Sequence, residues 1–227
     1  MKDEFACLAI ETATDSCTVA AVKASEVSSI ELPDPRASVR DIYGSINRVI
    51  SEAGLTLAEL DCIAFGAGPG SFTGIRIAAS VAQSLAFGFN LPVCRVSSLA
   101  VLAAGARQRH GVNCVAACID ARKRQAYLGV YQFAEDGDID TVIADQLVDP
   151  LAYRLDPDRP VFAAGPGWAN YPEFPELQGR AITASDFMAK PLAGDLLTLA
   201  EYQFQRGETV DARSALPNYV RDRVTET

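Results

Sequence analysis

The same strand–turn–strand pattern occurs twice in this sequence of 227 residues, and it limits the fold more than any other feature. Residues 5–22 contain two apolar runs separated by a turn rich in Thr, Asp and Ser, whose side chains bond to nearby backbone. Residues 114–131 repeat that organisation. Placing Glu11 over Asp120 aligns the two hairpins without a gap. The alignment predicts two structural units of related topology.

Two later segments strengthen the repeat. The sequence VFAAGPGW at 161–168 echoes IAFGAGPGSF at 63–72, and a helix predicted at about 191–206 echoes one predicted at 73–88. The echoes come in the same order as the hairpins, which favours a duplicated βββ–helix–β–helix unit. No low-complexity linker separates the halves, so we place the boundary at 96–98.

The remaining elements follow from the spacing of apolar residues. A helix is predicted at about 38–53, where Ser38 is suited to cap the start and Gly54 to end the helix. Strands are predicted at 62–65 and 92–96, and a further helix at about 98–109. The alternation of strands and helices predicts an α/β fold.

Composition excludes several classes of protein. A hydrophobic content of 49% with 22% charged residues is typical of a globular protein, and no apolar run approaches the ~20 residues needed to span a bilayer. The N-terminal residues contain early acidic side chains and no apolar signal core, so we expect a cytoplasmic protein without membrane association. The six cysteines form no C-x-x-C motif and are expected to be reduced and structural.

Charge and histidine content narrow the chemistry further. A net charge of −9 argues against a large phosphate-binding surface, although a local basic patch stays open. The only histidine is His110, which precedes Gly111 at a predicted helix end and is better suited to a C-terminal position in that helix than to catalysis or metal binding. We therefore expect no metal site, and no Ser/His/Asp or Cys/His enzyme.

The loop Gly66–Gly70 joins a strand to the helix at 73–88 and admits three interpretations. It could cradle nucleotide phosphates at a helix N-terminus, form a tight turn between strand and helix, or present backbone to a partner. It is neither a P-loop nor a G-x-G-x-x-G motif, because no Lys-Ser/Thr pair follows it and Thr73 stands where the last glycine would be.

The helix at 73–88 is apolar around most of its circumference. At about 100° per residue one narrow stripe holds Arg76, Ser80, Gln83 and Phe87, and apolar residues cover the rest of the helix. A helix of this kind is buried on more than one side, and its own sheet covers only one face. Small residues allow another helix to approach closely. We therefore expect a partner to cover part of this helix, with the chain's own helix at 38–53 or its second domain as the alternative cover.

With these features in view, the chain resembles the TsaB (YeaZ) family of bacterial partner subunits that act in making threonylcarbamoyladenosine on transfer RNA. The matching segments run in family order over nearly the whole length: AIETATDSCTVAAV, FGAGPGSFTGIRIAASVAQSLAFG, LPVCRVSSL, CIDARKRQAYLGVY and LPNYVR. The resemblance implies two tandem actin-like, ribonuclease-H-like α/β domains, each a mixed sheet packed with helices. We place the domains at 1–97 and 98–227 and allow the C-terminal tail to return to the first domain.

The resemblance also implies a scaffold or activator, and not an enzyme. The catalytic relative TsaD binds its metal through two histidines on its first long helix, whereas residues 36–40 contain none. In the family TsaC makes the threonylcarbamoyl adenylate, TsaD transfers it to the adenosine next to the anticodon, and TsaE supplies ATPase-linked cycling. The resemblance implies direct binding to TsaD through a helical bundle, contact with TsaE, a homodimer in the absence of TsaD, and only indirect contact with tRNA.

The partner surface implied by the family lies on the helices at 38–53 and 73–88. The residues expected to form it are Val39, Ile42, Ile46, Ile75, Arg76, Ala79, Ala82, Gln83 and Ala86. We expect Arg76 to make polar contacts at the edge of the bundle. Replacing Ala79 or Ala82 by Phe is expected to abolish TsaD binding while leaving the monomer folded.

An ATP-dependent small-molecule kinase of the actin-like superfamily is the alternative function. In such proteins acids at the positions of Glu11 and Asp120 hold a magnesium-bound water beside ATP, whereas the simpler interpretation is that each acid bonds its own turn. Residues that would lie near a nucleotide are Glu11, Thr12, Gly68, Gly70 and Asp120. We expect no cofactor on the isolated chain, with ATP and magnesium as candidates within the complex. A peptidase, a label also used for the wider family, has little support without metal ligands or a histidine-based nucleophile.

Overall fold

The computed structural model describes residues 5–32, 35–135 and 137–220, and only the backbone of residues 35–40. The chain forms two compact units. Unit 1 comprises Met1–Val101 together with Pro191–Pro217, and unit 2 comprises Leu102–Lys190 with the residues from Asn218 onward. The division differs from the predicted one, and the reason lies in the destination of a single helix.

Unit 1 is built on a five-stranded sheet in the order β3-β2-β1-β4-β5. The first three strands form an antiparallel meander, and β4 and β5 then continue the sheet in parallel with β1. The strand bounds are β1 (Ala6–Glu11), β2 (Cys17–Lys23), β3 (Glu26–Leu32), β4 (Cys62–Gly66) and β5 (Val93–Val96).

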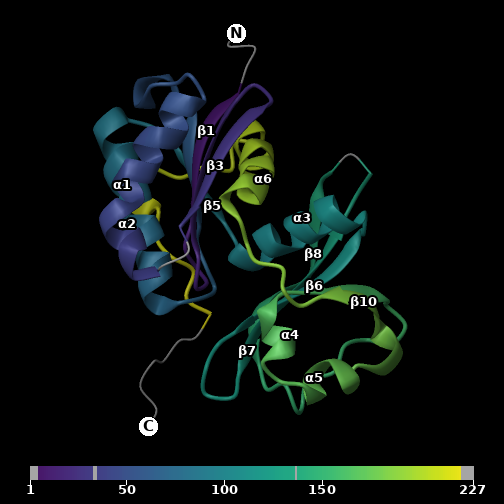
Figure 1. The fold of residues 1–227 in the computed structure, drawn as a ribbon. Coiled ribbons are helices and arrows are strands. Elements are labelled where there is room, and N and C mark those ends of the chain that lie inside the picture. The colour runs from purple at the N-terminus through teal and green to yellow at the C-terminus, as the bar shows by residue number, and fades with distance from the viewer. Residues whose placement is uncertain (1–4, 33–34, 136, 221–227) are drawn as a thin grey trace. The chain divides into compact units, whose positions relative to one another are not determined.

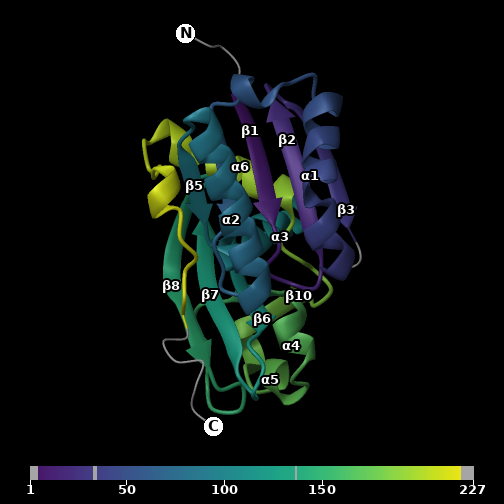
Figure 2. The ribbon, with the colours of Figure 1, turned by 90° about the vertical axis from the view of Figure 1, so that its left-hand side faces the viewer.

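Helices cover both faces of this sheet. Figures 1 and 2 show α1 (Pro35–Glu52) and α2 (Phe72–Phe89) side by side on one face and α6 (Ala193–Gln205) on the other. Two short 3₁₀ turns, η1 (Leu57–Glu59) and η3 (Ala212–Ser214), complete the unit. The arrangement is a three-layer α/β sandwich, the class that the alternating elements predicted.

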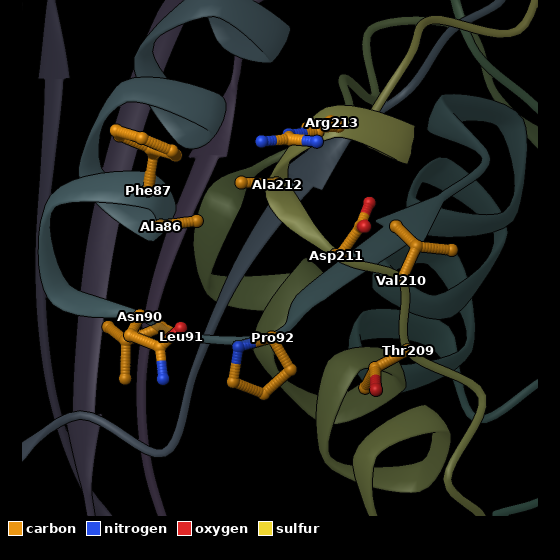
Figure 3. Close-up of a pocket in the computed structure, with 10 residues that line it drawn as sticks. All are labelled: Ala86, Phe87, Asn90, Leu91, Pro92, Thr209, Val210, Asp211, Ala212 and Arg213. Atoms are coloured by element: carbon orange, nitrogen blue, oxygen red, sulfur yellow. The ribbon is translucent and has the colours of Figure 1, made fainter.

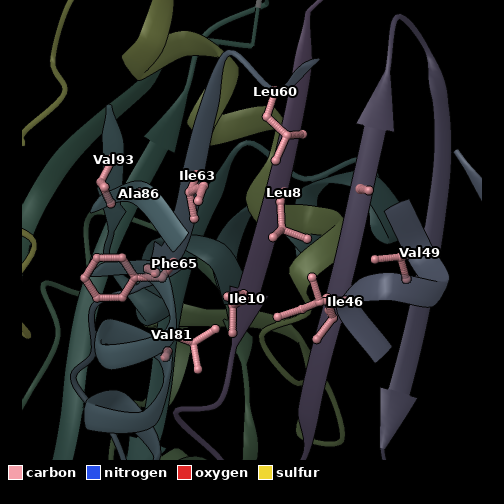
Figure 4. Packing of buried hydrophobic residues seen from close by; sticks show 14 of the residues in the cluster. Leu8, Ile10, Ile46, Val49, Leu60, Ile63, Phe65, Val81, Ala86 and Val93 are labelled. Atoms are coloured by element: carbon pink, nitrogen blue, oxygen red, sulfur yellow. The ribbon is translucent and has the colours of Figure 1, made fainter. Parts of the chain in front are cut away.

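The core of unit 1 follows the two-residue alternation of its strands. Leu8 and Ile10 on β1, with Phe65 on β4, are fully buried and pack in one cluster with Ile46 and Val81 of the helices (Figure 4). The other face of the sheet meets α6. There the Ala193 amide at the start of α6 donates a 2.8 Å hydrogen bond to the hydroxyl of Thr18.

Unit 2 contains a second five-stranded sheet in the order β10-β9-β6-β7-β8. Its first three strands are again antiparallel, and the last two again run parallel to the first. The strand bounds are β6 (Cys114–Asp120), β7 (Ala126–Phe133), β8 (Ile139–Val148), β9 (Val161–Ala164) and β10 (Ile182–Asp186).

Short helices lie between the last two strands of unit 2: α4 (Pro166–Ala169), α5 (Glu173–Glu176) and the 3₁₀ turn η2 (Gly179–Ala181). Trp168 of α4 is fully buried, stacks on Phe174 of α5 and donates a 3.1 Å hydrogen bond from its indole to the Ala116 carbonyl of β6. The long helix α3 (Ser98–His110) begins in unit 1, and its residues from Leu102 onward belong to unit 2.

The duplication is confirmed at the level of topology, since both sheets place their strands in the order third-second-first-fourth-fifth. Glu11 and Asp120 end the equivalent strands β1 and β6. Gly68 and Gly165, which align in the repeated glycine segment, both have positive φ angles of 92° and 105°. Each unit has one strand more than the predicted βββ–helix–β–helix unit.

Two predictions about the C-terminal half need correction. The helix at 191–206 is not the counterpart of α2, because α6 follows β10, the fifth strand of the second sheet, as α3 follows β5, the fifth strand of the first sheet. Nor does residue 98 begin the second domain, because residues 98–101 belong to unit 1. Residues 191–217 also belong to unit 1, which is the return that was allowed for the C-terminal tail. The reason is packing, since α6 covers the free face of the first sheet and Val210 pairs with Val93 at its edge.

Candidate partner-binding surface

The glycine loop after β4 is fixed from two directions. Gly68 has a φ of 92°, which favours glycine, and its carbonyl accepts a 3.0 Å hydrogen bond from the Ser98 amide at the start of α3. Ala67 donates 2.7 Å to the Val96 carbonyl of β5, and Ser71 caps α2 by accepting from the Gly74 amide. The loop therefore connects β4 to α2 while bonded to the next strand and helix.

The same loop and the first turn of α2 pack directly on the β1–β2 turn. A Cβ atom on Gly70 would lie 2.4 Å from the Ala13 carbonyl oxygen, and one on Gly74 would lie 1.9 Å from that of Thr12. The hydroxyl of Thr12 donates 2.7 Å to the Gly74 carbonyl in return. These glycines serve a close approach of backbone to backbone, which is the tight-turn interpretation of the motif.

Glu11 lies beneath this loop and is almost completely buried. Its Oε1 accepts a 2.6 Å hydrogen bond from the Ala13 amide, and its Oε2 accepts 2.8 Å from the Ser98 hydroxyl. A Cβ atom on Gly66 would lie only 1.9 Å from Oε2. Burial raises the pKa of Glu11 to about 7 against these hydrogen bonds, which lower it. Both carboxylate oxygens are thus engaged within unit 1.

Asp120 makes the equivalent bond in unit 2. Its Oδ1 accepts 3.0 Å from the Arg122 amide, two residues on, as Glu11 accepts from Ala13. It also accepts 2.9 Å from the hydroxyl of Tyr171. Of the five residues predicted near a nucleotide, the four of unit 1 meet around the β1–β2 turn and the glycine loop, and Asp120 lies in unit 2.

A groove opens between α1 and α2 on the outer side of unit 1. It has a volume of about 440 Å³ and a largely apolar lining formed by Ile42, Tyr43, Phe72, Thr73, Arg76, Ile77, Ser80 and Val81. The guanidinium of Arg76 lies 3.7 Å from the centre of the Phe72 ring, a cation–π contact on the groove wall.

Large exposed aromatic side chains gather on the same two helices. Among the described residues, four of the five exposed aromatics belong to α1 and α2: Tyr43 (50% exposed), Phe72 (45%), Phe87 (72%) and Phe89 (43%). Tyr43 and Phe72 line the groove together, whereas Phe87 and Phe89 lie at the other end of α2. Contiguous apolar exposure, as around the groove, marks interaction sites more often than isolated exposed residues do.

Eight of the nine predicted interface residues have described side chains, and these eight divide into two groups. Arg76 is exposed and Gln83 is half-buried, as the polar stripe required. The side chain of Val39 lies outside the described residues. The remaining six are at most 3% exposed and pack inside unit 1 itself: Ile42, Ile46, Ile75, Ala79, Ala82 and Ala86.

This burial corrects the expectation that Ala79→Phe and Ala82→Phe leave the monomer folded. Ala82 has no exposed surface and belongs to the cluster formed by the sheet, α1 and α2, so a phenyl ring there would overpack the unit's own core. The helical pattern identified α2 correctly as covered on more than one side, but α1 and the sheet provide much of the cover. The aromatic residues Tyr43 and Phe72 were missed, although a large ring among small residues was a usable signal.

A second hollow lies at the C-terminal end of α2, between that helix and the segment 209–213 (Figure 3). Its volume is about 480 Å³. Asn90 caps α2 there in the left-handed conformation, and Phe87 projects at the rim. The carboxylate of Asp211 accepts 2.8 Å from the Ser214 amide, which lowers the pKa of Asp211. Together with the α1–α2 groove, this hollow gives α2 a partly apolar recess near each of its ends.

Two further observations concern metals and membranes. Within residues 5–32, 35–135 and 137–220, no three His, Cys, Asp or Glu side chains are grouped so that they could hold a metal ion. No helix in that part of the chain has the length and apolar character needed to cross a bilayer. His110 does end α3 as predicted, with Gly111 following at a φ of 66° and the imidazole 3.0 Å from Asp186.

The family model described as "TsaD: tRNA N6-adenosine threonylcarbamoyltransferase" matches residues 35–226. The tRNA threonylcarbamoyladenosine biosynthesis protein TsaB of Haemophilus influenzae is 35% identical, covering 96% of this chain and 94% of its own. The TsaB protein of Escherichia coli is 33% identical, with coverages of 96% and 95%. The solved structure of YeaZ from Pseudomonas aeruginosa superposes with a TM-score of 0.86 at 37% identity, covering 95% of this chain and 99% of that one. On these matches and on its duplicated sheets, the chain belongs to the TsaB (YeaZ) family of the actin-like superfamily.

Proposed function

We propose that this protein is a non-catalytic subunit in the synthesis of threonylcarbamoyladenosine on tRNA, and that it acts by binding TsaD. Support comes from relatives of 33–35% identity that are named biosynthesis proteins for this modification, and from the TsaD-type family model. In this proposal TsaD carries out the transfer, TsaE joins the assembly, and ATP and magnesium act in the assembled complex.

The observation that carries the proposal is the groove between α1 and α2. Its apolar lining, with Tyr43 and Phe72 exposed at its edge, presents a surface of the kind that a partner helix buries. Helices of TsaD that correspond to α1 and α2 are the proposed occupant, so that four helices pack together. A second copy of this chain offers the same face, and we propose a homodimer when TsaD is absent.

The acids at the strand ends support a scaffold over the kinase alternative. Both oxygens of Glu11 bond to groups of its own unit, and Asp120 bonds to Tyr171 and to the backbone of its own turn. These carboxylates hold turns in place. The kinase alternative requires micromolar binding of magnesium-ATP to the isolated chain in calorimetry, and we expect none.

The deciding experiment is capture of TsaD by variants of this chain. Phe72→Asp and Tyr43→Asp place a charge in the groove without altering the core, since both side chains are about half exposed. Each should lower the affinity for TsaD by about tenfold or more, as expected for an aromatic anchor. Leu151→Asp in unit 2 is a matched control with 48% exposure and should bind TsaD like the wild type.

Threonylcarbamoyl transfer to tRNA by TsaC, TsaD and TsaE should fall in parallel with TsaD binding. Wild-type binding and transfer by both aspartate variants would remove the groove from the proposal. Turnover by this chain in the absence of TsaD would contradict its non-catalytic role.

A further inference from the structure

The β6–β7 turn of unit 2 presents three cations in an uncommon backbone conformation. Arg122, Lys123 and Arg124 have φ angles of 62°, 52° and 60°, and all three are exposed. Side chains rarely adopt the left-handed region, and runs of three are rarer because the Cβ atom approaches the following carbonyl oxygen each time. Such strain persists only where surrounding contacts impose it, and it concentrates at functional sites.

The contacts that impose it can be identified. The turn closes through hydrogen bonds from the Ala121 amide to the Gln125 carbonyl, at 2.9 Å, and from the Gln125 amide to the Arg122 carbonyl, at 3.0 Å. The hydroxyl of Tyr171 lies against both ends, 2.9 Å from Asp120 Oδ1 and 3.1 Å from the Gln125 carbonyl. Burial and the neighbouring Asp120 raise the pKa of Tyr171 to about 12, so the hydroxyl keeps its proton as a donor.

The duplicated turn of unit 1 shows that the fold does not need this conformation. Its residues 12–16 are Thr, Ala, Thr, Asp and Ser, and none has a positive φ. That turn packs under the glycine loop, where the Ala13 carbonyl accepts 2.7 Å from the Ser71 amide. The turn of unit 2 instead lies at the surface, with three exposed cationic residues. From a common topology, one turn has become an internal support and the other a charged surface.

We propose that Arg122, Lys123 and Arg124 form a site for backbone phosphates of RNA, and that the RNA is the tRNA substrate of the complex. The inference rests on the proposed function, which supplies the RNA, and it adds a direct contact with tRNA to the indirect one that the family resemblance implied. The chain has a net charge of −9, so three consecutive cationic residues make this turn a local exception to an acidic protein. Guanidinium groups match phosphate oxygens in geometry. Arg122 also lies 3.7 Å from the Asp120 carboxylate, which holds its guanidinium beside the turn. The contact would position the RNA without reading its sequence.

The test uses the full chain bound to TsaD and an unmodified tRNA transcript, with affinity measured over a range of salt concentrations. The double variant Lys123→Glu/Arg124→Glu leaves Arg122 and its bonds to Asp120 in place. We expect its affinity to fall by about tenfold near 0.1 M salt and the slope of log K against log salt to decrease by about 1 to 2 units.

The matched control is Arg154→Glu/Arg159→Glu, which changes the net charge equally within unit 2. Both arginines are exposed. Arg159 interacts electrostatically with Cys114, which begins β6 at the opposite end of the strand from the turn. This variant should keep the wild-type affinity and slope. Equal losses in both variants, or no loss in the turn variant, would overturn the site. A synthetic acidic peptide that binds the wild-type turn while the tRNA affinity of the turn variant is unchanged would assign the site to a protein partner instead.

The outcome is separable from the proposed function. Capture of TsaD is measured first, and the turn variant should capture TsaD like the wild type because the α1–α2 groove is untouched. Failure of the wild-type chain to bind TsaD overturns the proposed function. Normal TsaD binding with unchanged tRNA binding overturns only the phosphate site.

Discussion

Glu11 at the end of β1 and Ser98 at the start of α3 are joined by a buried hydrogen bond of 2.8 Å, although they are separated by 87 positions in the chain. The same carboxylate also holds the β1–β2 turn through the Ala13 amide. Glu11 therefore ties together three parts of unit 1: the end of the central strand, the turn that follows it, and the first residue of the helix that leads into unit 2.

The pKa of Glu11 predicts how stability changes with pH. The folded value is about 7 and the ordinary value is 4.5, so the folded state holds a proton that the unfolded state releases. The resulting stabilisation, about 3 kcal/mol at most, is fully present below pH 4.5 and is lost as pH rises through 7. We expect urea unfolding to show lower stability at pH 8 than at pH 5.

Glu11→Gln tests the assignment, because the amide has nearly the same shape and no charge. The unfolding free energy of this variant should change much less between pH 5 and pH 8 than that of the wild type. At pH 8 the variant should be the more stable of the two. The same pH dependence in both proteins would show that another group is responsible.

Gly66→Ala should destabilise unit 1 by about 3 kcal/mol, because the new methyl group overlaps Glu11 Oε2 and forces the carboxylate from its two donors. Unit 2 has Ala163 at the equivalent place together with the shorter Asp120. Combining Gly66→Ala with Glu11→Asp should therefore recover part of the loss in thermal or urea unfolding.

Gly44→Ala in α1 provides the control for that substitution. A Cβ atom at this position would meet no atom within 4 Å apart from its own helix backbone, so the change should be neutral or stabilise the helix by up to about 1 kcal/mol. If the Gly66→Ala/Glu11→Asp double variant is as unstable as Gly66→Ala alone, the loss does not come from a clash with Glu11.

Ala82→Phe should unfold unit 1 or lower its unfolding free energy by about 3 kcal/mol, since the side chain has no exposed surface. Circular dichroism during thermal unfolding provides the measurement. Phe72→Asp, whose side chain is 45% exposed, should melt within a few degrees of the wild type. If Ala82→Phe melts like the wild type, the core around α2 is looser than the burial of Ala82 implies.

Lys123→Gly should raise stability and lower tRNA affinity at once. Glycine adopts the left-handed conformation without the steric cost, and we expect a gain of about 1 kcal/mol in unfolding free energy. Lys123→Ala removes the same charge and keeps the strained backbone, so it should match the glycine variant in tRNA affinity without the gain in stability. Equal stability of the two variants would contradict the strain.

The hairpins and long helices could be predicted because each has a strong local pattern. The helix predicted at 73–88 is observed at Phe72–Phe89, and that predicted at 98–109 is observed at Ser98–His110. The edge strands β3 and β8 were not assigned to residues. Both are only half-buried and mix polar with apolar side chains, so neither shows an apolar run.

The sequence allowed the C-terminal tail to return to the first domain but could not decide which sheet α6 covers, for a different reason. Its sequence shows an apolar face, but nothing in that face specifies which of two related sheets it covers. The prediction of the partner surface was wrong for a similar reason. Ile42 and Ala82 are apolar residues on predicted helices, and only packing decides whether the chain itself or another protein covers them. Glu11 was identified from its position, whereas its engagement by Ser98 depends on a contact between distant segments.

Because α6 completes unit 1 from the far end of the chain, the two halves of the sequence are not independently transplantable modules. A fragment ending at residue 97 would expose the sheet face around Cys7 and Thr18 to solvent, and we expect it to aggregate. The duplication is therefore visible as symmetry of strand order, while α6 makes the first half of the sequence dependent on the second.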